Sequence, residues 1–116
     1  MQVLGTNSIG VDVGSYDSGA VDEIDLYFAK TPTESAAYKV MQYFNAIPTS
    51  STEVSIELIS DYLKPGGYDF QSIGATGDTV NISVSGNVVT ATFANISLSS
   101  GGTAGKVSGT IVAKAQ

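Results

Sequence analysis

The chain contains no cysteine, histidine, arginine or tryptophan. Without cysteine there is no disulfide framework, and without cysteine or histidine the common nucleophile–base pairs of enzymes are unavailable. The positive charge rests on five lysines, which form no cluster of the kind that binds nucleic acid or anionic membranes. No stretch approaches the ~20 apolar residues that a membrane-spanning helix requires. These absences argue against catalysis, nucleic-acid binding and membrane insertion.

The sequence is instead rich in serine, threonine, glycine and valine, which occur in short alternating runs. A chain of 116 residues predicts one domain over residues 1–116, large enough to fold without a metal or disulfides. Eleven carboxylates against five lysines give a net charge of −6. All of the carboxylates lie at or before Asp78, so the first two-thirds of the chain is strongly acidic. No basic-then-apolar leader begins the sequence.

Alternation of apolar and polar residues predicts strands at residues 9–13, 24–28 and 54–58. The segment Lys64–Gly67 reads Lys-Pro-Gly-Gly and predicts a tight turn, because Pro presets the first central torsion and Gly accepts the positive φ that follows. We expect Tyr68–Phe70 to start the next strand.

The carboxy-terminal third predicts a β-hairpin. Val80–Val84 and Val89–Phe93 alternate on either side of a turn at Ser85–Asn87. Beyond Phe93 the apolar residues change parity, which would turn a straight strand's apolar face outward. A bulge near Ala94–Asn95 would restore the register.

Residues 99–105 are small and predict a flexible loop, followed by a last strand over Val107–Ala113. Within that strand, Gly109 indicates a bulge or a place where a neighbouring side chain lies across the backbone. The chain is therefore expected to end as an antiparallel meander.

One segment predicts a helix. Thr31-Pro32-Thr33-Glu34 has the spacing of a capping box, and apolar residues then recur at helical intervals, which favours one short helix near residues 33–45. The alternative is a strand, because alternate residues of this segment also share one face of a strand and Val, Tyr and Phe favour sheets. The helical set is Ala37, Val40, Met41 and Phe44, and the strand set is Tyr38, Val40, Gln42 and Phe44.

Whether residues 33–45 form a helix or a strand, the predicted fold class is all-β. We predict an antiparallel β-sandwich of about seven to nine strands with a carboxy-terminal meander, joined by short turns.

Five carboxylates gather in the amino-terminal part of the chain. Their spacing does not match a calcium loop, with acids at alternate positions, a central Gly and a closing Glu. The pattern instead predicts a solvated acidic edge that keeps the sheet from pairing with another chain. We therefore expect no metal site. We also expect no cofactor and, without histidine or cysteine, no catalytic residue. The five are Asp12, Asp17, Asp22, Glu23 and Asp25.

The turn at residues 64–67 is flanked by Tyr62, Tyr68 and Asp69. Tyrosines beside a carboxylate can stack on a sugar ring while its hydroxyls bond to the acid. These three residues are the predicted ligand-binding positions. The alternative is that each tyrosine packs its ring on the core and leaves its hydroxyl in water.

Three segments carry a resemblance to a known group of proteins, namely Leu63–Phe70, Asn81–Phe93 and Val107–Ile111. Over residues 53–114 the chain resembles the small β-sandwich lipoproteins of Bacteroidetes-type bacteria, with their Pro-Gly-x-Tyr turn, Val-rich hairpin and final Ser-Gly-Thr strand. The resemblance implies a periplasmic, cell-surface or extracellular protein. It also implies a lipid anchor on the full-length precursor, with the signal peptide and lipidated Cys removed and Met1 added for expression.

The expected function is a non-enzymatic secreted or cell-surface module that binds an unknown protein or glycan, or has a structural role. Two alternatives stay open, a carbohydrate-binding module and a self-assembling surface or fibre subunit.

Overall fold

The structure is a computed structural model that describes residues 2–4, 8–15, 20–43, 48, 50–60, 68–74 and 76–114, with side chains for residues 24–43, 48, 50–59, 69–74 and 76–114. Every regular element in these residues is a strand, so the predicted all-β class is confirmed. The nine strands are β1 (Gln2–Leu4), β2 (Ser8–Ser15), β3 (Ala20–Phe28), β4 (Ala36–Val40), β5 (Glu53–Ser60), β6 (Tyr68–Ser72), β7 (Thr79–Ser85), β8 (Val88–Ser100) and β9 (Thr103–Lys114).

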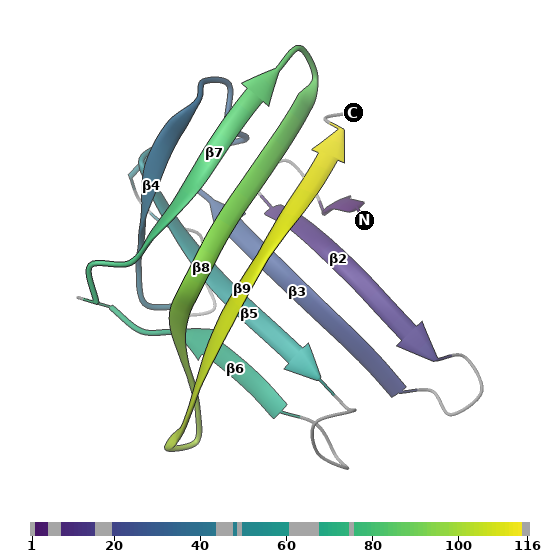
Figure 1. The fold of residues 1–116 in the computed structure, drawn as a ribbon, viewed down its shortest axis with the longest axis vertical. Helices are drawn as coiled ribbons and strands as arrows, with labels where there is room; N and C mark the ends of the chain where they lie inside the picture. Colours follow the sequence, from purple (N-terminus) through teal and green to yellow (C-terminus); the bar gives the residue numbers. More distant parts are fainter. Residues whose placement is uncertain are drawn as a thin grey trace.

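The strands fall into two groups that cross one another. Figure 1 shows β4, β7, β8 and β9 in front of β2, β3, β5 and β6. In the front group the neighbours run in the order β4-β7-β8-β9, and in the back group they run β1-β2-β3-β5-β6. The groups are joined where β4 pairs with β5 and where β6 pairs with β8.

The predicted antiparallel arrangement is wrong at one pairing. Lys39 and Val40 of β4 pair in parallel with Glu53 and Val54 of β5. Parallel neighbours need a crossover of about a dozen residues rather than a hairpin, and residues 41–52 supply it. Alternation reports which face of a strand is buried but not the direction in which the strand runs.

The predicted helix near residues 33–45 is also wrong in the described part of that segment, and the alternative, a strand, is confirmed. Ala36–Val40 is β4, in which Tyr38 and Val40 are buried while Lys39 between them is exposed. This two-residue period belongs to a strand, and the core outweighs the local capping signal. Residues 44–47 lie outside the described part.

The carboxy-terminal hairpin and its bulge are confirmed. Gly86 takes a positive φ of 60° in the turn between β7 and β8. Along β8 the partner of Phe93 is Gly109 and that of Ile96 is Val107, so two residues of β8 face one of β9. Asn95 at the bulge has φ 53°, and its N–H donates to Ser108 Oγ at 2.8 Å. The bulge keeps both Phe93 and Ile96 in the core.

The predicted flexible loop at residues 99–105 is wrong. Ser99 pairs with Ala104 and Ser100 with Thr103, so the strands run up to a two-residue turn. The turn is Gly101–Gly102, whose φ values of 54° and 89° suit glycine. A pair of glycines in a run of small residues here specifies a tight hairpin rather than a long loop.

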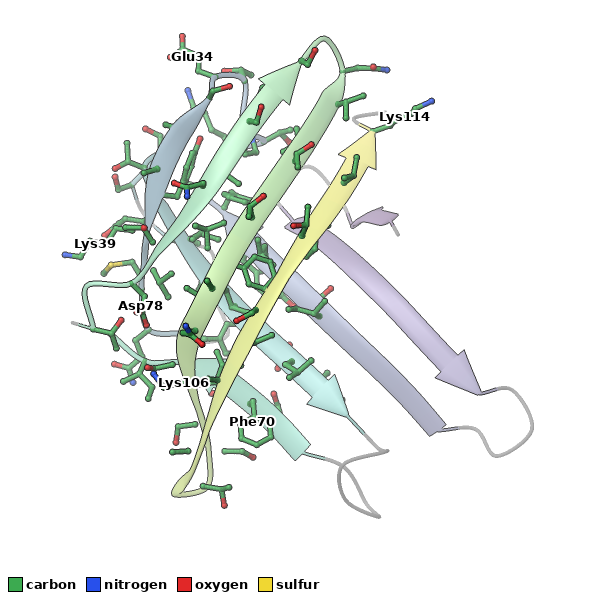
Figure 2. All side chains as sticks on the ribbon, in the orientation of Figure 1. Glu34, Lys39, Phe70, Asp78, Lys106 and Lys114 are labelled. Atoms are coloured by element: carbon green, nitrogen blue, oxygen red, sulfur yellow. The ribbon has the colours of Figure 1, made fainter. Side chains whose placement is uncertain are left out.

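Two further glycines of β9 lie against aromatic rings, and at Gly105 the ring is too close for a Cβ to fit without a shift. A Cβ at Gly109 would lie 3.6 Å from Phe93 Cζ, which confirms that a side chain lies across the strand there. A Cβ at Gly105 would lie only 3.0 Å from Phe70 Cε1, and Figure 2 shows Phe70 beside the turn-proximal half of β9. The predicted turn at Lys64–Gly67 lies outside the described residues.

One hydrophobic core joins the two groups. Phe28 of β3 meets Tyr38 of β4 edge to face, with ring centroids 5.4 Å apart. The cluster consists of Leu26, Phe28, Tyr38, Val40, Val54, Ile56, Phe70, Val80, Ile82, Val89, Ala91, Phe93, Ile96, Leu98, Ile111 and Ala113.

A buried serine completes the hydrogen bonding where β5 changes neighbours. On one edge β5 pairs with β4 through Val54 and with β6 from Glu57 onward, which leaves Ile56 between the two. The Ile56 N–H donates to Ser72 Oγ at 3.0 Å, and that hydroxyl donates to the Met41 carbonyl at 2.6 Å. Ser72 therefore bonds the buried N–H of Ile56, which would otherwise be orphaned, and the partly buried carbonyl of Met41.

We expect Ser72→Ala to lower the free energy of unfolding by about 1–3 kcal/mol, because a buried N–H loses its partner. Ser55→Ala is the matched control. Ser55 is equally buried, at 1% exposure against 2% for Ser72, but its hydroxyl has no hydrogen-bond partner. Its removal should leave stability unchanged or raise it. Urea denaturation of both variants measures the difference, and equal losses would contradict the assignment.

Candidate functional site

Polar side chains meet on the outer face of β3, β5 and β6. Side chains alternate along a strand, so Glu57 points away from the core that its neighbour Ile56 enters. Asp25 of β3 pairs with Glu57 of β5, and Glu57 pairs with Gln71 of β6. Three strands thus bring together residues far apart in sequence. We call Asp25, Tyr27, Tyr43, Glu57 and Asp69 the acid–tyrosine cluster.

Two tyrosine hydroxyls converge on one carboxyl oxygen of this cluster. Tyr27 Oη donates to Glu57 Oε1 at 3.3 Å, and Tyr43 Oη donates to the same atom at 3.4 Å. Tyr27 Oη also lies 3.4 Å from Asp25 Oδ2. The two rings lie 5.4 Å apart and are tilted by 33°. The tyrosines therefore cover the acids and shield them from water.

The burial of these acids changes how they titrate. Asp25 is only 3% exposed and Glu57 8%. Burial, then a hydrogen bond and charge repulsion from Asp69, raise the pKa of Glu57 from 4.5 to about 7, although the bond from Tyr27 lowers it in part. Burial and the nearby carboxylates also raise the pKa of both Tyr27 and Tyr43. Near neutral pH both phenols are thus protonated and Glu57 exchanges a proton readily.

A shallow hollow of about 290 Å³ adjoins the cluster and shares Tyr43 with it. Gln71 Nε2 lies 3.5 Å from Asp69 Oδ2, which links the hollow to the cluster's exposed acid. Ile73 contributes an apolar side chain that is 38% exposed. The hollow is lined by Gln42, Tyr43, Gln71, Ser72, Ile73, Ser99 and Gly101.

The segment after β4 places two of these lining residues. The Met41 N–H donates to the Val54 carbonyl at 2.8 Å, and the Tyr43 N–H donates to the Ser72 carbonyl at 3.1 Å. Gln42 lies between them, and a Cβ added at Gly74 would be 3.3 Å from its Cβ. The segment is thus held between β5 and β6, so that Gln42 and Tyr43 have fixed backbone positions at the rim.

Of the three predicted ligand-binding residues, the structure places one. Asp69 is exposed on β6, at the edge of the acid–tyrosine cluster. Tyr62 lies outside the described residues, as does the side chain of Tyr68, whose backbone starts β6. Sequence reasoning missed Tyr27, Tyr43 and Glu57 as site residues.

The predicted solvated acidic edge is wrong for Asp25. This residue is buried, and β3 is an inner strand between β2 and β5. The alternating pattern placed Asp25 correctly on the face opposite the core. It could not show that tyrosines cover that face.

Within the residues whose side chains are described, no group of three or more acids is arranged to hold a metal ion. The described residues also include no helix long and apolar enough to cross a bilayer. No protein-family model matches the chain, and neither a curated protein nor a solved structure resembles it significantly.

The raised pKa of Glu57 predicts a pH dependence of stability. Between 4.5 and about 7 the folded protein keeps a proton that the unfolded chain releases. The stabilising contribution is therefore complete below 4.5 and is lost as pH rises to about 7.

Glu57→Gln cannot ionise, so its free energy of unfolding relative to wild type should increase from about pH 5 to about pH 8. Glu53→Gln changes a carboxyl on the same strand outside the acid–tyrosine cluster, and as the control it should not reproduce that increase. Urea denaturation at several pH values measures both. A flat difference for Glu57→Gln would contradict the buried-acid assignment.

Proposed function

We propose that this chain is a non-enzymatic binding module whose ligand is a neutral carbohydrate, held in the hollow beside the acid–tyrosine cluster. The observation that carries the proposal is the lining of the hollow. Two glutamines, two serines and a tyrosine share one concave surface with the apolar side chain of Ile73.

Sugars suit such a surface because they have both apolar ring faces and hydroxyls that donate and accept. Gln42 and Gln71 each offer two donors and an acceptor. The ring of Tyr43 and the side chain of Ile73 offer apolar contact. Among the described residues no lysine lines the hollow, which disfavours an anionic ligand.

The arrangement of acids favours binding over glycoside hydrolysis. The catalytic carboxyls of glycosidases flank the scissile bond at about 5–5.5 Å or more. Here Glu57 is only 8% exposed and lies beneath the hydroxyls of Tyr27 and Tyr43. A carboxyl covered in this way cannot flank a glycosidic bond.

The proposal also covers the arrangement of the strands and the location of the protein. We infer that the two crossing groups of strands form a β-sandwich with the core between them. By the resemblance to Bacteroidetes-type lipoproteins, the module acts in the periplasm, at the cell surface or outside the cell, with a lipid anchor on the precursor.

Calorimetric titration with a panel of soluble neutral polysaccharides tests the proposal. We expect one glycan to bind, and the double variant Gln42→Ala, Gln71→Ala to weaken binding by about tenfold or more, because each amide makes hydrogen bonds worth about 1 kcal/mol. Asn81→Ala is the matched control. It removes an exposed amide on β7, outside the hollow, and should bind like wild type.

Tyr62→Ala and Tyr68→Ala, measured in the same titrations, test the positions predicted from the sequence. A loss of affinity in either variant would extend the site toward the turn at residues 64–67. Equal binding by the amide double variant and wild type, or no binding of any glycan, would contradict the proposal.

A further inference from the structure

Strand β9 lies at an edge of the sheet, beside β8. In the described part of the chain its twelve residues pair only with β8. Strands β1 and β2 approach β9 without pairing with it. Along the rest of β9, the backbone N–H and carbonyl groups on the side away from β8 are open to pairing, as on any edge. Figure 1 shows its turn-proximal half at the front of the molecule, away from β2.

The sequence of β9 protects this edge weakly. It has no proline and no carboxylate, and its outward-facing side chains include Val112, which is 44% exposed. The only charged residues are Lys106 and Lys114, both labelled on β9 in Figure 2. Edge lysines repel a second strand of the same charge, so these two residues disfavour pairing of β9 with another β9. They favour pairing with an acidic strand.

The same molecule offers an acidic edge. Strand β1 covers only Ser8–Gly10 of β2, so the backbone of Val11–Ser15 pairs only with β3 among the described residues. Asp12 lies in this segment, and its neighbours on β3 include Asp22 and Glu23. Figure 1 shows this end of β2 pointing away from β9, so the two open edges are separate surfaces of one molecule.

We propose that a second copy of this chain adds its β2 edge to β9, so that copies associate head to tail. The distribution of charge supports this partner. All eleven carboxylates lie at or before Asp78, and the charged residues after it are lysines. Because the contact joins two different surfaces, it leaves one open edge at each end and can propagate into a filament. The proposal is independent of carbohydrate binding, since the hollow lies on other strands.

Sedimentation velocity over a range of concentrations and salt tests the proposal. Wild type should form species larger than dimers at low salt and dissociate as salt rises, because screening weakens exposed charge pairs. The double variant Lys106→Glu, Lys114→Glu should raise the dissociation constant by about tenfold or more.

The matched control is Lys30→Glu, Lys39→Glu, which changes the net charge equally through exposed lysines away from β9. It should associate like wild type. A wild type that stays monomeric at every concentration, or stops at dimers, would overturn the proposal. Equal weakening in both double variants would overturn it too, since net charge alone would then explain the effect.

Discussion

The hydroxyl of Ser72 completes the hydrogen bonding of β5 at the point where the sheet turns from the back group to the front. It accepts from the Ile56 N–H and donates to the Met41 carbonyl. A buried backbone group without a partner costs about 1–3 kcal/mol, so the change of neighbour from β4 to β6 depends on this one side chain. The same bond fixes Met41, and through it the position of Gln42 and Tyr43 at the hollow.

A second polar side chain accepts a backbone hydrogen bond where β8 changes its neighbouring strand. On one edge β8 pairs with β7 up to Thr92 and with β6 from Leu98. In the gap between them the Ser97 N–H donates to Asp78 Oδ2 at 3.0 Å. Together, Ser72 and Asp78 allow β4, β5, β6, β8 and β7 to pair in a closed circuit. Closure gives each of these five strands a partner on both sides. Among the described residues, open edges are left on the added strands β1, β2 and β9.

Local patterns in the sequence predicted the parts of this fold that depend on adjacent residues. The parity change after Phe93 indicated the bulge, because a buried face must stay buried. The circuit was not predictable, since its pairings join residues distant in sequence and depend on side chains such as Ser72. The site was missed for a similar reason. Alternation put Glu57 on a polar face, but Tyr43, which covers it, comes from an irregular segment that no periodicity describes.

Burying a carboxyl beneath two tyrosines has a consequence for what the surface can recognise. An ionised Glu57 beside Asp69 would place two negative charges together, and the raised pKa shows that the fold favours the neutral acid. A neutral carboxyl donates one hydrogen bond and accepts others, as the tyrosine hydroxyls do. The polar surface beside the hollow therefore combines carboxyls with hydroxyls and side-chain amides that both donate and accept hydrogen bonds. Such a surface complements hydroxyls, which also donate and accept, better than it complements anions.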